Sequence, residues 1–277
     1  MGRGTLQLNS YIHLFFLAVF FFVGSIPDLN AQEKLVIIGG GKRPPEVLKK
    51  FVNWADNERI LIVSWASDEP EEYTEAFLKD LSPHFTGIAD ASNARPQTIQ
   101  QQNVFIEQLS KATGVFFTGG DQTNIMNTLE APGGNEMMIK LQEAYSNGIV
   151  FGGTSAGTAI MSETIITGDM EEGVTPLRKG FGFLAPEIIV DQHFTQRKRK
   201  KRLLSALTQT HKNIGIGIDE STALYVTNKD QYEVAGTNQA NVFVRSANDN
   251  SYLETKFSNG ETFDFSKIDI QYSISTN

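Results

Sequence analysis

A serine flanked by glycines is the clearest candidate for chemistry in this sequence. Ser155 lies between Gly153 and Gly157 in the run FGGTSAGTAIMS, where a buried apolar run gives way to a helical pattern. The pattern G-x-S-x-G is typical of a nucleophile elbow, a sharp strand-to-helix turn that exposes the serine hydroxyl near the first helical N–H groups. Small neighbours are needed because a Cβ would collide with the tight turn. A Gly/Ser-rich connecting turn has the same pattern, so the residues that could pair with Ser155 must show whether this is a nucleophile elbow or only a turn.

A serine hydroxyl is a poor nucleophile at neutral pH unless a base takes its proton, and the usual base is an imidazole oriented by a carboxylate. His193 directly follows an apolar strand, and we expect it to be the base. The other histidines lie in the N-terminal leader, at a helix-to-strand junction and in a polar turn, at His13, His84 and His211. Asp219 and Glu220 stand at a neighbouring strand end. Strand alternation lets only one of these two acids point into the site, and the pattern does not choose between them.

The order of these groups along the chain separates classes of serine hydrolase. An α/β-hydrolase places its acid before its histidine, which would require Ser155, Asp191 and His211, with His211 at the end of a helix. The order Ser155, His193 and then an acid at 219 or 220 places every group after a strand. The sequence therefore points away from the α/β-hydrolases.

Short apolar runs that alternate with amphipathic segments must position these groups, and this pattern indicates a parallel sheet covered by helices. The strand candidates are 35–38, 60–64, 114–118, 149–153, 187–191 and 214–219, and the helical segments are 44–55, 71–81, 96–110, 135–147 and 198–209. After Ser221, short alternating strands are expected at 223–227, 232–236, 241–246, 252–257, 261–265 and 268–273. The prediction is an α/β fold, a doubly wound, mostly parallel sheet with helices on both faces. A C-terminal antiparallel β extension, most simply a meander, completes the same domain.

Ligands bind outside the carboxyl ends of the strands in open α/β sheets, so the segments that follow the strands define the expected site. They are 39–43 (GGGKR), 119–122 (GGDQ), 152–157 (GGTSAG), 191–194 (DQHF) and 219–222 (DEST). GGGKR lacks the spacing of a phosphate-binding loop, and no His or carboxylate pair has the spacing of a metal site. We therefore expect neither a cofactor nor a metal ion.

Composition and the N-terminus bear on partners and location. The net charge of −8 argues against nucleic-acid binding, and the absence of cysteine excludes disulfides, thiol nucleophiles and lipoprotein anchoring. Arg3 precedes the apolar run 11–23, and a plausible processing site follows Ala31. This pattern predicts a secretory signal peptide at 1–31, with an uncleaved anchor as the alternative. Residues 32–277 would then form a single α/β domain, secreted or periplasmic, with no stable membrane insertion.

Four motifs resemble those of a known family. GGDQ, GTSAG, DQHFxxRxRxxRL and GIGIDE stand at 119–122, 153–157, 191–203 and 215–220. In that order and spacing they closely resemble the cyanophycinases, in the S51 family of serine peptidases, which also holds aspartyl dipeptidases. The resemblance implies a class I glutamine-amidotransferase-like α/β fold with a Ser-His-Glu or Ser-His-Asp site.

By motif position, the resemblance implies catalytic roles for five residues. The nucleophile would be Ser155, the base His193 and the orienting acid Glu220, in preference to its aspartate neighbour. The oxyanion hole would be formed by the backbone N–H groups of Gly120 and Ala156, because a tetrahedral intermediate needs donors where its negative charge develops.

The resemblance also implies a set of substrate-binding residues, namely Gln122, Asp191, Gln192, Arg197, Arg199 and Arg202. Asp191 would meet a cationic group, and the arginines would face carboxylates, which their planar fork bonds bidentately. Without the resemblance, the run RKRKKR at 197–202 would be interpreted as a solvated helix face. Because DQHF precedes the run, we expect its arginines to contact substrate and its lysines to remain solvated.

The sequence therefore predicts a secreted serine exopeptidase with an acyl-enzyme mechanism. It would release β-Asp-Arg dipeptides from cyanophycin, the polymer of aspartate with arginine side chains (multi-L-arginyl-poly-L-aspartate). A dipeptidase or isopeptidase acting on short aspartyl peptides is the alternative within the enzyme class. A catalytically silent peptide-binding protein is the alternative from another class. A homodimer is a further expectation that the family implies.

Overall fold

The computed structural model describes residues 32–246, 249 and 251–267. The predicted signal peptide at 1–31 and the strand predicted at 268–273 lie outside the described residues. Within them, no helix is long and apolar enough to cross a membrane.

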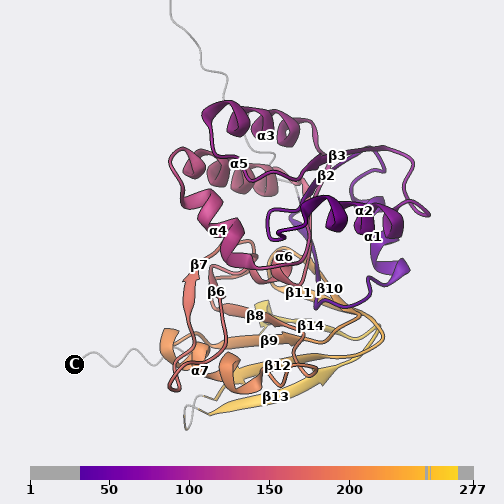
Figure 1. Cartoon of the computed structure of the whole chain (residues 1–277). Coiled ribbons are helices and arrows are strands. Elements are labelled where there is room, and N and C mark those ends of the chain that lie inside the picture. The colour runs from indigo at the N-terminus through magenta and orange to yellow at the C-terminus, as the bar shows by residue number, and fades with distance from the viewer. Residues whose placement is uncertain (1–31, 247–248, 250, 268–277) are drawn as a thin grey trace, which may run out of the picture.

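The elements follow the predicted alternation of strands and helices in the first half of the chain and become strand-rich in the second (Figure 1). The strands are β1 (Lys34–Ile38), β2 (Arg59–Val63), β3 (Ile88–Ser92), β4 (Gly114–Phe117), β5 (Val150–Thr154), β6 (Thr164–Ile166), β7 (Leu177–Lys179), β8 (Ile188–Gln192), β9 (Ile214–Ile218), β10 (Thr222–Thr227), β11 (Gln231–Gly236), β12 (Ala240–Arg245), β13 (Tyr252–Phe257) and β14 (Thr262–Asp264). The helices are α1 (Pro45–Trp54), α2 (Pro70–Leu81), α3 (Ile99–Lys111), α4 (Gln122–Glu130), α5 (Gly134–Ser146), α6 (Ala156–Ala159) and α7 (Lys200–Thr210), and a 3₁₀ turn covers Phe265–Lys267.

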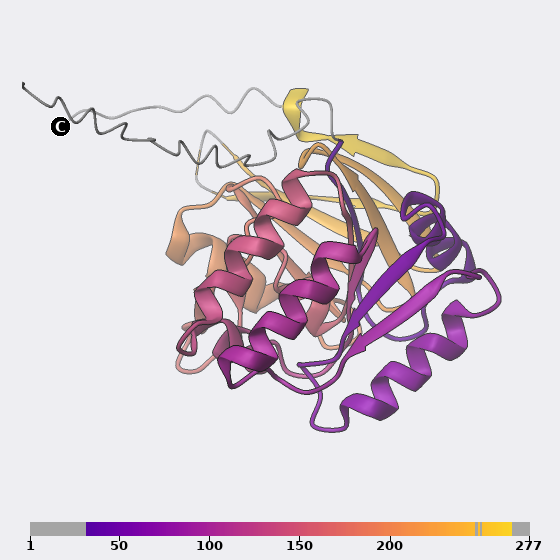
Figure 2. The ribbon, with the colours of Figure 1, turned by 90° about the horizontal axis from the view of Figure 1, so that it is seen from above.

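The central sheet has eight strands in the order β14-β11-β10-β1-β5-β4-β2-β3. The five strands from β1 to β3 in this order are parallel, and β10, β11 and β14 extend the sheet antiparallel. Helices α1 and α2 cover one face and α3 and α5 cover the other (Figure 2). The inner strands are buried on both faces, which explains their continuous apolar runs. The predicted fold class is confirmed.

A second sheet, in the order β13-β12-β9-β8, departs from the expected arrangement. The runs predicted at 187–191 and 214–219 pair with each other in parallel instead of joining the central sheet, and β12 and β13 add to β9. The C-terminal strands are therefore divided between two sheets and form no single meander. A run buried on both faces shows that a strand is internal, but not which sheet contains it.

The second sheet is also buried on both faces. Ile188, Val190 and Ile216 belong to the same apolar core as α3, α5 and one face of the central sheet. On its other face, Ile189 packs with Leu203 of α7 in a separate cluster. The two sheets and their helices thus form successive layers, with α7 as the outer cover of the second sheet (Figure 1).

The sequence prediction missed β3, α4, β6 and β7, and the first two were missed for identifiable reasons. Strand β3 is an edge strand whose residues are mostly exposed, so it lacks the apolar run of a buried strand. Helix α4 begins directly at Gln122, within a segment expected to be a loop, and Asp121 caps it by accepting the Thr123 N–H at 2.8 Å.

Candidate active site

Ser155 occupies the turn between β5 and α6 with φ 53° and ψ −111°, a backbone conformation that non-glycine residues rarely adopt. A Cβ on Gly153 would lie 2.3 Å from the Gly157 carbonyl oxygen, and one on Gly157 would lie 2.1 Å from the Phe117 carbonyl oxygen. Neither distance can be accommodated, so the two glycines permit the turn. The helix that follows has four residues, so the individual N–H groups near Ser155 contribute more to binding a negative charge there than a helix dipole does.

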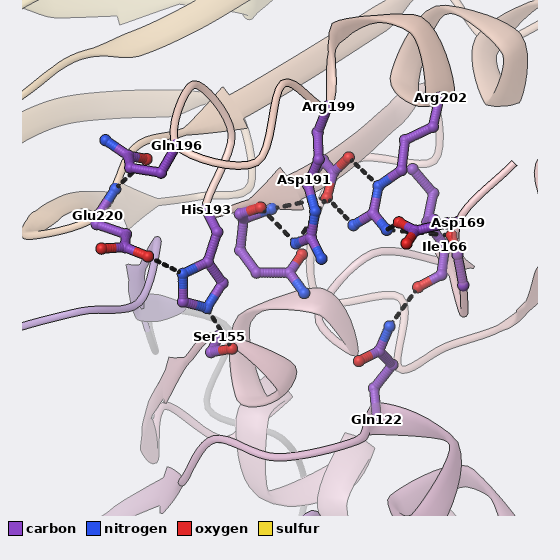
Figure 3. Close-up of polar contacts among 12 residues, drawn as sticks. Gln122, Ser155, Ile166, Asp169, Asp191, His193, Gln196, Arg199, Arg202 and Glu220 are labelled. Carbon is purple, nitrogen blue, oxygen red and sulfur yellow. Dashed lines mark hydrogen bonds and ion pairs between the residues drawn. The ribbon is translucent and has the colours of Figure 1, made fainter.

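Three side chains form a hydrogen-bonded relay across the two sheets (Figure 3). Ser155 Oγ lies 2.8 Å from His193 Nε2, and His193 Nδ1 lies 2.6 Å from Glu220 Oε1. A carboxylate can only accept, so Nδ1 carries the proton in this pair and leaves Nε2 free to accept from the serine hydroxyl. This is the geometry that activates a serine nucleophile.

The two acids that the sequence pattern left open have different partners. Glu220 contacts the imidazole, whereas Asp219 accepts the Thr195 N–H at 2.9 Å and so holds the turn that follows His193. Gln196 Oε1 accepts the Glu220 N–H at 3.0 Å (Figure 3). Glu220 is therefore held at its backbone while its carboxylate faces the ring.

The environment of His193 suits a base that must be neutral. Burial lowers the pKa of His193 from its ordinary value of 6.5, and the charges of Arg197 and Arg199 lower it further, whereas Glu220 raises it. The imidazole is 9 % exposed. The net lowered pKa keeps the ring unprotonated, and able to accept a proton, at neutral pH.

The predicted oxyanion donors are the backbone N–H groups of Ala156, which directly follows Ser155, and of Gly120, in the loop after β4. A Cβ on Gly119 would be 3.5 Å from the Ser155 Cβ, which places the loop after β4 against the serine. Gly120 has φ +133°, and a Cβ there would meet the Ala66 carbonyl oxygen at 2.3 Å. Within the part of the chain that the structure describes, the N–H groups of Gly120 and Ala156 donate to no protein group. Both donors are therefore available to a ligand oxygen.

An arginine supports the loop on which Gly120 rests. Arg95 donates to the carbonyl oxygens of Trp65 (2.7 Å) and Ser67 (2.9 Å), on either side of Ala66. The Ala66 carbonyl in turn accepts the Asp121 N–H at 2.9 Å. Arg95 thereby holds the segment after β2, and the Ala66 carbonyl of that segment binds the loop that carries Gly120.

Asp191, at the end of β8, pairs with a cationic group of the protein itself. Its carboxylate is fully buried and accepts from Arg202 Nε (2.8 Å) and Nη2 (2.5 Å), while Arg202 Nη1 also contacts the exposed Asp169 at 3.1 Å (Figure 3). Burial raises the pKa of Asp191, and the hydrogen bonds from Arg202 oppose that rise. The expected cationic partner of Asp191 is thus the protein's own Arg202, and the expected carboxylate partner of Arg202 is Asp191.

The other two arginines of the basic run differ in burial. Arg199 donates to the Gln192 carbonyl at 2.6 Å and lies 3.7 Å from Asp191, and its Nε is buried without a partner among the described residues. Burial lowers the pKa of Arg199 to about 10, so the group stays charged at neutral pH. Arg197 is exposed. Helix α7 begins at Lys200, two residues later than the predicted start at 198, so Arg197 and Arg199 both precede it.

The two glutamines of the expected pocket are buried. Gln122, at the start of α4, donates to the Ile166 carbonyl at 2.6 Å, and Gln192 precedes His193 at the end of β8. Figure 3 shows Gln122 on the side of Ser155 where Arg199 and Arg202 lie. Their roles toward substrate remain predictions.

Several contributors were not found from the sequence. Asp169, Gln196 and Arg95 carry no local signal, because their partners are distant in the chain. The GGGKR run at 39–43 was expected at the site as a strand-end segment, but no role was assigned to its glycines. Within the described residues, no group of three or more His, Asp or Glu side chains could hold a metal ion.

Comparisons with known proteins identify the family of this chain. The model of Peptidase family S51 matches residues 35–234. The cyanophycinase of Geminocystis herdmanii (strain PCC 6308) is 33% identical over 219 residues, covering 74% of this chain and 78% of that protein. The cyanophycinase of Trichormus variabilis is 31% identical over 214 residues, covering 73% and 70%.

The fold has solved counterparts as well. A crystal structure of a peptidase from an acI-B1 Actinobacterium superposes with a TM-score of 0.62 at 20% identity, covering 84% of this chain and 96% of that one. A second structure, of a putative peptidase E protein from Listeria monocytogenes EGD-e, has a TM-score of 0.56 at 15% identity. With a family match over most of the chain and curated relatives above 30% identity, the chain belongs to peptidase family S51 and is a cyanophycinase-like serine peptidase.

Proposed function

We propose that this protein is an exported exopeptidase that releases β-Asp-Arg dipeptides from the end of cyanophycin through a Ser-His-Glu acyl-enzyme mechanism. The observation that carries the proposal is the relay from Ser155 Oγ to His193 Nε2 (2.8 Å) and from His193 Nδ1 to Glu220 Oε1 (2.6 Å). The curated relatives named cyanophycinases supply the substrate class.

The mechanism follows from the donors and acceptors of the site. Ser155 Oγ attacks the scissile carbonyl carbon while His193 Nε2 takes the hydroxyl proton, and Glu220 stabilises the imidazolium. The N–H groups of Gly120 and Ala156 bind the oxyanion. Collapse breaks the C–N bond as His193 returns the proton to the leaving amine. Water, deprotonated by His193, then hydrolyses the ester and frees Ser155.

The charges near the base favour a substrate with carboxylates. Arg197 and Arg199 lie close enough to His193 to lower its pKa, so their positive charge reaches the site where the scissile bond must lie. Each unit of cyanophycin offers the carboxylate of its arginine side chain to such cations. Arg202 is not assigned to the substrate, because Asp191 occupies it.

The test is hydrolysis by the purified protein, with dipeptide release measured by chromatography and mass spectrometry. Ser155→Ala should lower kcat by about 10⁶-fold, whereas Ser110→Ala, on an exposed serine of α3, should leave it unchanged. Cleavage of short aspartyl peptides without dipeptide release from the polymer would show that the protein is a dipeptidase and not a cyanophycinase. Binding without turnover of either substrate would contradict a catalytic role.

Export is part of the same proposal and rests on the N-terminal sequence alone. The leader predicts removal of residues 1–31, which would leave Gln32 as the first residue of a single-domain mature protein. N-terminal mass spectrometry of protein recovered outside the cytoplasm checks this. An intact Met1 in that fraction would contradict processing, and recovery only from the cytoplasm would contradict export.

A further inference from the structure

The glycine turn that follows β1, residues 39–41, contacts each part of the candidate triad. The carbonyls of residues 38–40 accept, in order, the backbone N–H groups of Ser155 (3.0 Å), His193 (2.7 Å) and Ser221 (2.8 Å). Ser221 directly follows Glu220. One short segment of backbone therefore fixes the positions of nucleophile, base and acid relative to one another, although these residues follow strands of two different sheets.

The same turn contacts the side chains of the relay. A Cβ on Gly40 would lie 2.2 Å from Cε1 and 2.4 Å from Nε2 of His193, and one on Gly41 would lie 2.9 Å from the Glu220 Cβ. Gly40 has φ +100°. The imidazole of His193 therefore rests directly against the bare Cα of Gly40, with no room for a side chain between them.

We propose that Gly40 is a positioning residue that sets the orientation of the His193 imidazole, so that Nε2 meets Ser155 while Nδ1 meets Glu220. The inference rests on the proposed role of Ser155 as nucleophile. A methyl group at position 40 would overlap the ring at 2.2 Å, so it must move the imidazole away from the contacts at 2.8 Å and 2.6 Å that hold its two nitrogens. A displacement of about 1 Å at a reacting group costs on the order of 100-fold in rate.

A glycine with positive φ also permits a turn for purely structural reasons, and the chain supplies a matched control for that effect. Gly182 has φ +72°, and a Cβ there would meet no atom within 4 Å outside its two chain neighbours. Gly182→Ala therefore carries the backbone cost of a side chain at positive φ without any contact with the imidazole. Gly39 is unsuitable as a control, because its Cβ would strike the Asp219 carbonyl at 2.2 Å.

The first experiment measures the reactivity of Ser155 without relying on any peptide substrate. Purified wild-type protein and its variants react with an alkyl fluorophosphonate. The serine oxygen attacks phosphorus, fluoride leaves, and His193 takes the proton. Gly40→Ala should label Ser155 at least about 100-fold more slowly. Gly41→Ala should have an intermediate effect, because its Cβ would meet the Glu220 Cβ at 2.9 Å, a milder overlap than that of Gly40 with the ring at 2.2 Å. Gly182→Ala should match the wild type. With a hydrolysed substrate, Gly40→Ala should lower kcat and leave KM unchanged.

A second experiment tests the contact itself through a double-mutant cycle of thermal unfolding. If the ring is what the new methyl strikes, Gly40→Ala should lower the melting temperature in the wild-type background and cost less in a His193→Ala background. This comparison remains possible if Gly40→Ala alone folds poorly.

The outcomes separate the inference from the proposed function. Wild-type labelling of Gly40→Ala, an equal loss in Gly182→Ala, or an unfolding cost that persists without the imidazole would each overturn the inference. Failure of wild-type protein to label at Ser155 would overturn the proposed nucleophile, and the unfolding cycle would still decide whether Gly40 positions the ring.

Discussion

Replacing Asp191 by asparagine tests whether this residue pairs with Arg202 or recognises substrate. The carboxylate is fully buried, and Arg202 has a side chain that is 6 % exposed. Asn keeps the size of Asp191 but removes its charge, so a buried guanidinium loses its principal partner. Removing one member of a buried ion pair costs about 3 to 5 kcal/mol. At about 2 to 4 °C per kcal/mol for a domain of this size, the melting temperature should fall by about 6 to 20 °C.

Asp169→Asn provides the matched control, because it removes a carboxylate from the same guanidinium at an exposed position. Asp169 is 91 % exposed and lies 3.1 Å from Arg202 Nη1. Exposed ion pairs contribute about 0 to 1 kcal/mol, so this variant should melt within about 4 °C of the wild type. Thermal unfolding followed by circular dichroism, together with denaturant titration, measures both changes.

A third variant distinguishes the cost of leaving Arg202 unpaired from the cost of removing the Asp191 carboxylate itself. The double replacement Asp191→Leu with Arg202→Met removes both charges and should recover a large part of the stability that Asp191→Asn loses. If Asp191→Asn instead unfolded like the wild type and raised KM alone, the carboxylate would serve the substrate, as the sequence first suggested. That result would refute the assignment of Asp191 to Arg202.

Two further predictions concern the relay. Glu220→Gln should lower kcat by about 10⁴-fold, since it removes the charge that stabilises the imidazolium. Asp219→Asn keeps an acceptor for the Thr195 N–H and should retain activity. Equal losses of kcat in the two variants, measured by steady-state assays, would contradict the choice of Glu220 as the acid. Because the base must be neutral and the pKa of His193 is lowered, kcat/KM should fall only as pH drops below about 6.5. Arg197→Gln removes a charge that lowers this pKa, so the acidic limb should move to higher pH, most clearly at low salt. A limb that stays in place would contradict the contribution of Arg197.

The sequence by itself determined features that arise within one element or from its burial. The apolar runs identified the inner strands because both their faces exclude water, and the amphipathic segments identified five of the long helices, all but α4. The turn around Ser155 could be recognised because its glycines are required by nearby backbone. A side chain on Gly153 would strike residue 157, four residues along, and one on Gly157 would strike the adjacent strand β4. The position of His193 at a strand end followed from the same local pattern.

Only the tertiary structure decided which side chains meet. The pairing of Asp191 with Arg202 and the contact of Gly40 with His193 each join segments from separate elements. So does the contact of Glu220 with His193, which the residue pattern left open and the family resemblance alone favoured. A pattern with a period of two or 3.6 residues gives the face on which a side chain lies. It does not give the sheet that a strand joins or the rotation of one element against another, and these set distances of 2.6 to 2.8 Å. Catalytic contacts at this range therefore depend on how the two sheets pack.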